Sequence, residues 1–256
     1  MRRRVGIVIS CGLVWMGAAI SCAGPRAPEA VPAAVAATPA TPAATPPSAP
    51  DLAYHMRVSF WDALDAREAL ILGDLSGAKQ AAERLARTDY AHALPPAWMP
   101  WVMKLQQEAN ELTLAGDLHS ASLSLARIAL VCGECHELRD AGPTQPRAKP
   151  MPWEDPPESF DARMERHQLG MQQMWDGLVL PSEQAFRSGT VTITRAPLRA
   201  PERAEASVES SLHARIEEIR ALAKDARRAT SYEERGRVYG ELLSRCADCH
   251  YKGRPM

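Results

Sequence analysis

The chain has almost no excess charge. It carries 30 Lys and Arg residues against 31 Asp and Glu in a total of 256, which gives a formal net charge of −1. Beyond the first few residues no block of basic side chains occurs. A protein that binds nucleic acid or another polyanion is expected to concentrate positive charge. The composition therefore argues against a nucleic-acid partner.

A hydrophobic run long enough to cross a membrane is also missing. The longest apolar stretch, Val5 to Ile20, has 16 residues, whereas a spanning helix needs about 20. It follows the basic run Arg2–Arg4 and precedes small residues, an order typical of a secretory signal peptide. We therefore expect residues 1–22 to be a signal peptide that directs export to the periplasmic side of a Gram-negative bacterium.

The end of this segment, Ala19-Ile20-Ser21-Cys22, resembles the lipobox of bacterial lipoproteins. The resemblance implies that Cys22 becomes the lipidated N-terminus and anchors the protein to a membrane. Ala19 replaces the usual Leu, and ordinary cleavage nearby, for example after Ala23, is the alternative.

Spare cysteines are absent. Of the six, Cys11 and Cys22 belong to the signal region. The other four form two similar patterns, Cys132-Gly133-Glu134-Cys135-His136 and Cys246-Ala247-Asp248-Cys249-His250. No cysteine remains for a structural disulfide, although an exported protein could hold one.

Each pattern is a Cys-x-x-Cys-His signature, the attachment site of a c-type haem. Two thiols at this spacing add across the two vinyl groups of one porphyrin, and the imidazole that follows binds the iron from the proximal side. We therefore predict two covalently attached haem c groups. Their predicted attachment points and proximal ligands are Cys132, Cys135, Cys246 and Cys249, with His136 and His250 on the irons.

Two other readings of the cysteine pairs are open. A thioredoxin-like redox pair needs a βαβ context, and none is visible in the sequence. The two pairs together could also hold one zinc ion. That reading joins pairs about 110 residues apart and leaves both histidines without a role.

The organisation of the chain follows from composition and helical periodicity. Residues 23–50 are almost entirely Ala, Pro and Thr, which predicts a disordered tether. From residue 51 the pattern is helical, and Gly-Asp pairs at 73–74 and 116–117 mark the end of one helix and the start of the next. The first haem domain is predicted to span 51–140, with helices including 75–87, 101–114 and 118–138. A Pro-rich linker, 141–158, follows.

The second half repeats the first at a constant offset of 114 residues. Trp61 falls on Trp175, Ile128 on Leu242, and the first haem motif on the second. An offset that needs no gap indicates an internal duplication. We expect the second haem domain over 159–256, with helices opened by Ser159 and by the capping box Ser231-x-x-Glu234. The Thr-rich segment 189–202 is predicted to be extended, replacing part of the second helix of this half.

Four helices with one haem motif near their C-terminal end resemble class II cytochromes c, of the cytochrome c-prime and c556 type. The resemblance covers residues 51–140 and 159–256, and its specific part is the haem pentapeptide. It implies an all-α fold of two tandem four-helix-bundle-like haem domains, the second with a degenerate helix B. A tandem pair departs from the single-haem pattern of that family and leaves the role of each haem open.

The resemblance also directs attention to distal iron ligands. In an up-down-up-down bundle the start of the first helix lies beside the end of the fourth. The candidates are therefore His55 or Met56 for the first haem and His167 or Met171 for the second. Core packing of the methionines and surface placement of the histidines are the alternative.

These features favour a dihaem c-type cytochrome that carries single electrons between redox partner proteins and is not an enzyme. One alternative is a sensor or carrier of NO, CO or O2 with an open distal site. Another is a subunit that anchors a larger oxidoreductase. A haem peroxidase would need an acid–base pair beside an open iron, and no such pair is evident in the sequence.

Overall fold

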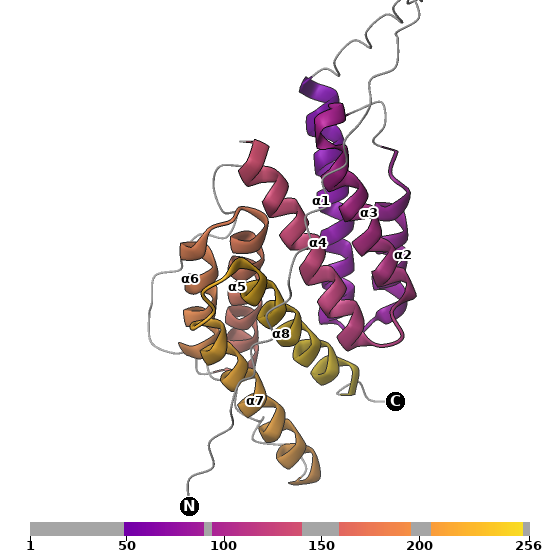
Figure 1. Ribbon diagram of the computed structural model, residues 1–256. Coiled ribbons are helices and arrows are strands. Elements are labelled where there is room, and N and C mark those ends of the chain that lie inside the picture. The colour runs from indigo at the N-terminus through magenta and orange to yellow at the C-terminus, as the bar shows by residue number, and fades with distance from the viewer. Residues whose placement is uncertain (1–48, 90–93, 140–158, 196–205, 253–256) are drawn as a thin grey trace, which may run out of the picture. The chain divides into compact units, whose positions relative to one another are not determined.

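The structure is a computed structural model that describes residues 49–89, 94–139, 159–195 and 206–252 (Figure 1). Over these ranges it contains eight α-helices, one short 3₁₀ helix and no strand, so the all-α prediction is confirmed. The predicted signal peptide with Cys22, nearly all of the tether and the linker lie outside the described residues.

Helix boundaries follow the predicted order. The elements are α1 (Ala49–Ile71), α2 (Leu75–Arg87), η1 (Pro96–Trp98), α3 (Met99–Leu114), α4 (Leu118–Arg139), α5 (Phe160–Val179), α6 (Glu183–Arg195), α7 (Ala206–Ala226) and α8 (Tyr232–Lys252). Helix α1 begins at Ala49 and so includes the last two residues of the predicted tether, within the usual uncertainty of helix ends.

The predicted break between α1 and α2 is a Schellman turn. Gly73 has a φ of 72°, a left-handed conformation that glycine adopts without steric cost. Its N–H donates to the Leu70 carbonyl at 2.9 Å, and the Asp74 N–H donates to the Ala69 carbonyl at 2.8 Å. The Asp74 carboxylate then caps α2 by accepting the Gly77 N–H at 2.9 Å.

Two helices of the second half, α5 and α8, begin at the predicted capping residues. The Ser159 hydroxyl accepts the Ala162 N–H at the start of α5. At α8 the Ser231 hydroxyl accepts the Glu234 N–H at 3.1 Å, and the Glu234 carboxylate accepts the Ser231 N–H at 3.3 Å. This reciprocal pair is the predicted capping box.

The prediction that helix B of the second half is degenerate is wrong. Helix α6 has 13 residues, as many as α2, and includes 189–195 of the segment expected to be extended. Ser182 caps it. The threonine hydroxyls bond back to carbonyls one turn earlier, as Thr192 does to Ser188 at 2.9 Å. Packing against α5 overrides the low helix propensity of the β-branched residues.

Consecutive helices in each half are neighbours, and the first helix of each half also contacts the fourth. Contacts between the halves run through α4 with α8, α4 with α5, and α1 with α8. A β-carbon on Gly236 would lie 2.6 Å from the Leu130 side chain, and one on Gly240 would lie 3.2 Å from Ala126. These pairs show that α4 and α8 run antiparallel and in close contact.

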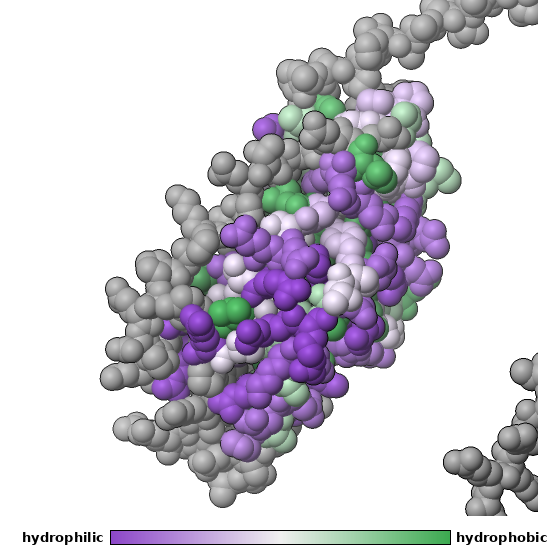
Figure 2. Space-filling view, turned by 60° about the vertical axis from the view of Figure 1, so that its left-hand side comes forward, coloured by the Kyte–Doolittle hydropathy of each residue, from purple (hydrophilic) through white to green (hydrophobic). Residues whose placement is uncertain are grey.

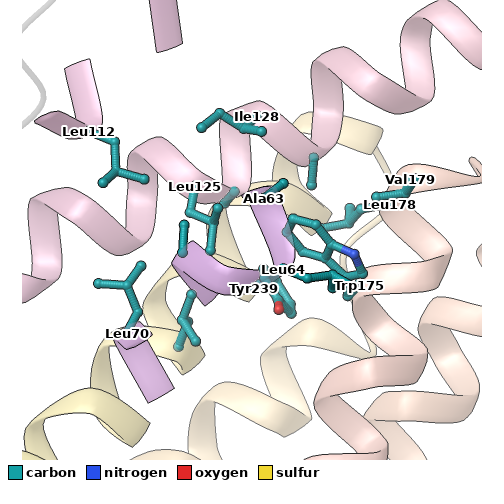
Figure 3. Close-up of a cluster of buried hydrophobic side chains, with 14 of the residues drawn as sticks. Ala63, Leu64, Leu70, Leu112, Leu125, Ile128, Trp175, Leu178, Val179 and Tyr239 are labelled. Carbon is teal, nitrogen blue, oxygen red and sulfur yellow. The ribbon is translucent and has the colours of Figure 1, made fainter. Parts of the chain in front are cut away.

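Buried apolar side chains from both halves form one cluster. In Figure 3, Trp175 and Tyr239 of the second half approach the part of α1 that carries Ala63 and Leu64. On the face in Figure 2, hydrophilic residues predominate and hydrophobic ones form separate patches. No helix among the described residues is long and apolar enough to cross a membrane.

Candidate functional site

The first Cys-x-x-Cys-His motif lies near the C-terminal end of α4 and forms part of the wall of an apolar cavity. The cavity has an empty volume of about 590 Å³, a figure that includes space open to solvent. It is lined by Met56, Ser59, Phe60, Leu94, Trp98, Trp101, Val102, Leu105, Val131, Cys132, Cys135, His136 and Val179.

This cavity brings three predicted haem-binding residues together with one of the predicted distal ligands. Cys132, Cys135 and His136 come from α4, and Met56 comes from the first turns of α1. The antiparallel contact of α1 with α4 places them there. His55 does not line the cavity; it is half-buried, and its ring lies edge-on to Tyr54 with 5.7 Å between the centroids. Of the two candidates for the first haem, the cavity therefore favours Met56.

The environment of His136 suits an iron ligand. Its Nδ1 lies 2.8 Å from the carbonyl oxygen of Val179 at the end of α5. A carbonyl only accepts, so Nδ1 carries the proton and donates, which leaves Nε2 with a free lone pair. Burial lowers the pKa of His136, and the Val179 carbonyl opposes part of that effect. The imidazole is therefore held neutral, the form that binds metals.

The first thiol of this motif, Cys132, is a poor nucleophile in the folded chain. Burial raises the pKa of Cys132 to about 12, and the neighbouring Cys135 adds to the effect. Thiolates are the reactive and metal-binding form of cysteine. This environment does not suit a redox-active or zinc-binding pair, and it is compatible with thioether bonds that form before the chain folds.

A close approach of three helices fixes the position of the first motif. The Tyr232 hydroxyl at the start of α8 donates to the Leu178 carbonyl of α5, and lies 3.4 Å from the Leu130 carbonyl of α4. A β-carbon on Gly133 would collide with both the Tyr232 hydroxyl and the Leu178 carbonyl. The first variable position of this motif therefore requires glycine.

The second motif lies near the C-terminal end of α8, where Cys246, Cys249 and His250 are half-buried. Burial raises the pKa of Cys246 to about 12, with Cys249 adding to the rise and Arg67 opposing it. Burial likewise raises the pKa of Cys249, against the opposing charge of Arg215. Both motifs thus hold their first thiol in the same kind of environment.

The two motifs lie toward opposite ends of the antiparallel α4–α8 pair. Gly133 lies against Tyr232 near one end, and near the other His119 lies 3.3 Å from Ser244. The 14 residues from His119 to Gly133 span about 21 Å of helix. Over the described ranges no cluster of three or more His, Cys, Asp or Glu side chains could hold a metal ion. The reading in which both cysteine pairs share one zinc ion is therefore wrong.

The remaining predicted ligands lie on α5. His167 and Met171 are 6% and 2% exposed and share the buried face of this helix with Met174 and Leu178. Their assignment to the second haem stays a prediction.

The aromatic residues divide between three environments. Phe60 lines the cavity and Trp175 is fully buried, whereas Trp61, its counterpart in the first half, is 55% exposed. Position in the repeat therefore did not predict the burial of this tryptophan.

Sequence reasoning missed a buried polar cluster beside the second motif. Arg67 of α1 is 3% exposed and its Nε donates to the Tyr239 hydroxyl at 3.0 Å. Its position three and four residues from Ala63, Leu64 and Leu70 was an available signal, because an arginine on the apolar face of a helix needs an explanation.

No family model, curated protein sequence or solved structure was found to match this chain.

Proposed function

We propose that the chain is an exported dihaem c-type cytochrome that passes single electrons between redox partner proteins. Each haem, when bound, supplies a one-electron Fe(III)/Fe(II) couple. On this proposal the protein makes and breaks no substrate bond. Its residues hold the cofactors, orient them and exclude water.

One observation carries the proposal: a single apolar cavity is lined by Cys132, Cys135 and His136 on one helix and by Met56 on another. Those are the residue types that attach a c-type haem and can supply both of its axial ligands. The neutral His136, with Nδ1 directed at the Val179 carbonyl, would present Nε2 to the iron. The thioether of Met56 would approach from α1.

We further propose that the two halves are duplicated four-helix units related by an approximate two-fold axis through the α4–α8 contact. The support is reciprocal pairing at the repeat offset. Gly240 corresponds to position 126 at the offset of 114, and a β-carbon on Gly240 would lie 3.2 Å from Ala126, so this position meets its own counterpart. Such reciprocity is what a two-fold contact requires.

The proposed membrane attachment depends on the predicted signal peptide and tether, which lie outside the described residues. Lipidation of Cys22 would hold the protein at a membrane, and the Ala/Pro/Thr-rich segment would keep the haem domains at a distance from it.

The visible spectrum of the reduced mature protein, before and after carbon monoxide, tests the electron-transfer role. We expect sharp α and β bands that the gas does not change, because Met56 and the second distal ligand fill the sixth coordination positions. Met56→Ala should open the first iron, so that carbon monoxide shifts about half of the Soret absorbance. The matched control is Met103→Ala, which removes an exposed methionine on α3.

A wild-type Soret band that shifts fully with carbon monoxide would contradict the electron-transfer proposal and favour the gas-binding alternative. If Met56→Ala behaves as wild type does, Met56 is not the distal ligand of the first haem.

A further inference from the structure

Arg67 carries a buried charge with no carboxylate in direct contact; the carboxylate of this network, Asp176, is reached through Gln172, whose amide donates to it at 2.8 Å. Its Nε donates to the Tyr239 hydroxyl and its Nη1 to the Gln172 side-chain carbonyl. Its Cζ lies 5.9 Å from the centre of the Trp175 ring. All three partners are uncharged, and no carboxylate of a described residue lies within 4 Å of the guanidinium.

A buried cation with only neutral hydrogen-bond partners destabilises the folded state unless another group compensates for the lost hydration energy. Placing a cation in the interior loses several kcal/mol of hydration energy, and neutral hydrogen bonds recover only part of that loss. A guanidinium has five N–H donors, and the chain uses two of them here. Arg67 therefore has hydrogen-bonding capacity available for a group that none of the described residues supplies.

The neighbouring group is the second haem motif. Tyr239 and Cys246 are seven residues apart on α8, so they share one face of that helix, about 10 Å apart along its axis. Because Arg67 bonds to Tyr239, its guanidinium lies along the same face. The charge of Arg67 also opposes the rise in the pKa of Cys246, as a cation near that thiol would.

A buried arginine also lies near the first motif, but its charge is paired: Arg235, which acts on Tyr232, lies 2.7 Å from the Glu183 carboxylate. At the repeat offset Arg67 corresponds to Pro181, and Tyr239 corresponds to Leu125. No arginine or lysine lines the cavity of the first motif. The charge of Arg67 therefore distinguishes the two sites.

We propose that Arg67, a residue of the first half, is the positioning residue that raises the reduction potential of the haem bound by the second half. The inference rests on the proposed function. A ferrous haem carries one positive charge fewer than a ferric haem, so a nearby fixed cation favours the reduced state; we take a charge separation of about 10 Å as the order of magnitude. At an effective dielectric constant of about 20, the interaction corresponds to roughly a tenfold change in the ratio of reduced to oxidised haem.

The experiment is a spectroelectrochemical titration of the mature dihaem protein with Arg67→Met and Arg67→Lys. In Arg67→Met one of the two one-electron steps should move to lower potential, with roughly tenfold less reduced haem at a fixed ambient potential, or about 59 mV. The other step should not move. Arg67→Lys keeps the charge without the planar guanidinium and should restore most of the potential.

Gln172→Glu supplies a second test if Arg67→Met does not fold. It places a carboxylate at the position that already accepts a hydrogen bond from Arg67, so it should lower the same step without removing the arginine. Tyr239→Phe controls for packing, since it keeps the charge in place and should leave both potentials nearly unchanged.

The outcomes separate this inference from the proposed function. If the wild-type protein takes up no haem, the proposed function fails. If both haems are attached and neither Arg67→Met nor Gln172→Glu moves a potential, the role of Arg67 is overturned and the cytochrome proposal stands. A shift of equal size in both steps would also overturn it, because the charge would not then act on one site.

Discussion

Gly133 gives the most exacting test of how the first motif is built. In Gly133→Ala the added methyl would occupy the space of the Tyr232 hydroxyl and the Leu178 carbonyl. The tyrosine can rotate away only by giving up its hydrogen bond to that carbonyl, and the backbone of α5 must also shift. The substitution therefore strains the contact of α4, α5 and α8 at the predicted haem site.

The magnitude follows from three contributions. Overpacking of a close-packed contact costs about 1–3 kcal/mol, and the lost hydrogen bond adds about 1 kcal/mol. Alanine in place of glycine within a helix returns about 1 kcal/mol. The expected net loss in the free energy of unfolding is about 1–3 kcal/mol, which in a protein of this size lowers the Tm by roughly 3–10 °C.

Thermal unfolding of the mature protein, followed by circular dichroism at 222 nm, is the assay. Gly116→Ala is the matched control, because a β-carbon there would meet nothing within 4 Å. If Gly133→Ala melts at the wild-type temperature, or shifts no more than Gly116→Ala, the close approach of the three helices at this motif is refuted.

Two further predictions concern α6. Phe186 is fully buried, so Phe186→Ala should lower the free energy of unfolding by about 3–5 kcal/mol, measured by urea titration. The control Arg195→Ala, at the exposed end of the helix, should change that free energy by less than about 0.5 kcal/mol. Equal effects of the two substitutions would contradict the packing of α6 on α5. The ion pairs of Glu183 with Arg187 and Arg235 hold the pKa of its carboxyl below the usual value of 4.5. A depressed carboxyl pKa stabilises the fold above the unfolded-state pKa, and the contribution disappears as the pH falls through the folded-state pKa. Glu183→Gln should therefore be less stable than wild type at pH 7, and the difference should disappear as the pH falls through the folded-state pKa of Glu183, with exposed Glu165→Gln as control; a difference that does not depend on pH would refute the assignment.

Local signals in the sequence predicted most of the helical framework. The Gly73–Asp74 break, the Ser159 cap and the Ser231–Glu234 box each appear where expected, because a cap depends on side chains within a few residues of the helix end. The prediction failed at α6. There Thr192 bonds to Gln173 of α5 at 2.8 Å, and such a contact between helices cannot be derived from local propensity.

The candidate site was predictable in part for the same reason. The cysteines and histidines were evident from their spacing, and the pair of candidates His55 and Met56 followed from the antiparallel relation of the first and fourth helices; only the cavity distinguishes Met56 from His55. The Arg67 cluster and the need for glycine at position 133 arise where α8 meets α1 and where α4 meets α5 and α8. Those contacts join residues between 45 and 172 positions apart and all cross between the two halves, so the sequence pattern of either half alone does not contain them.

The most direct test of the central claim is the mass of the mature protein under denaturing conditions, after expression with a working haem-attachment system. The account predicts two porphyrins that remain bound after unfolding. Cys132→Ala with Cys135→Ala should remove one of them, and Cys246→Ala with Cys249→Ala should remove the other. A wild-type mass equal to that of the polypeptide alone, without any covalent porphyrin, would contradict the account.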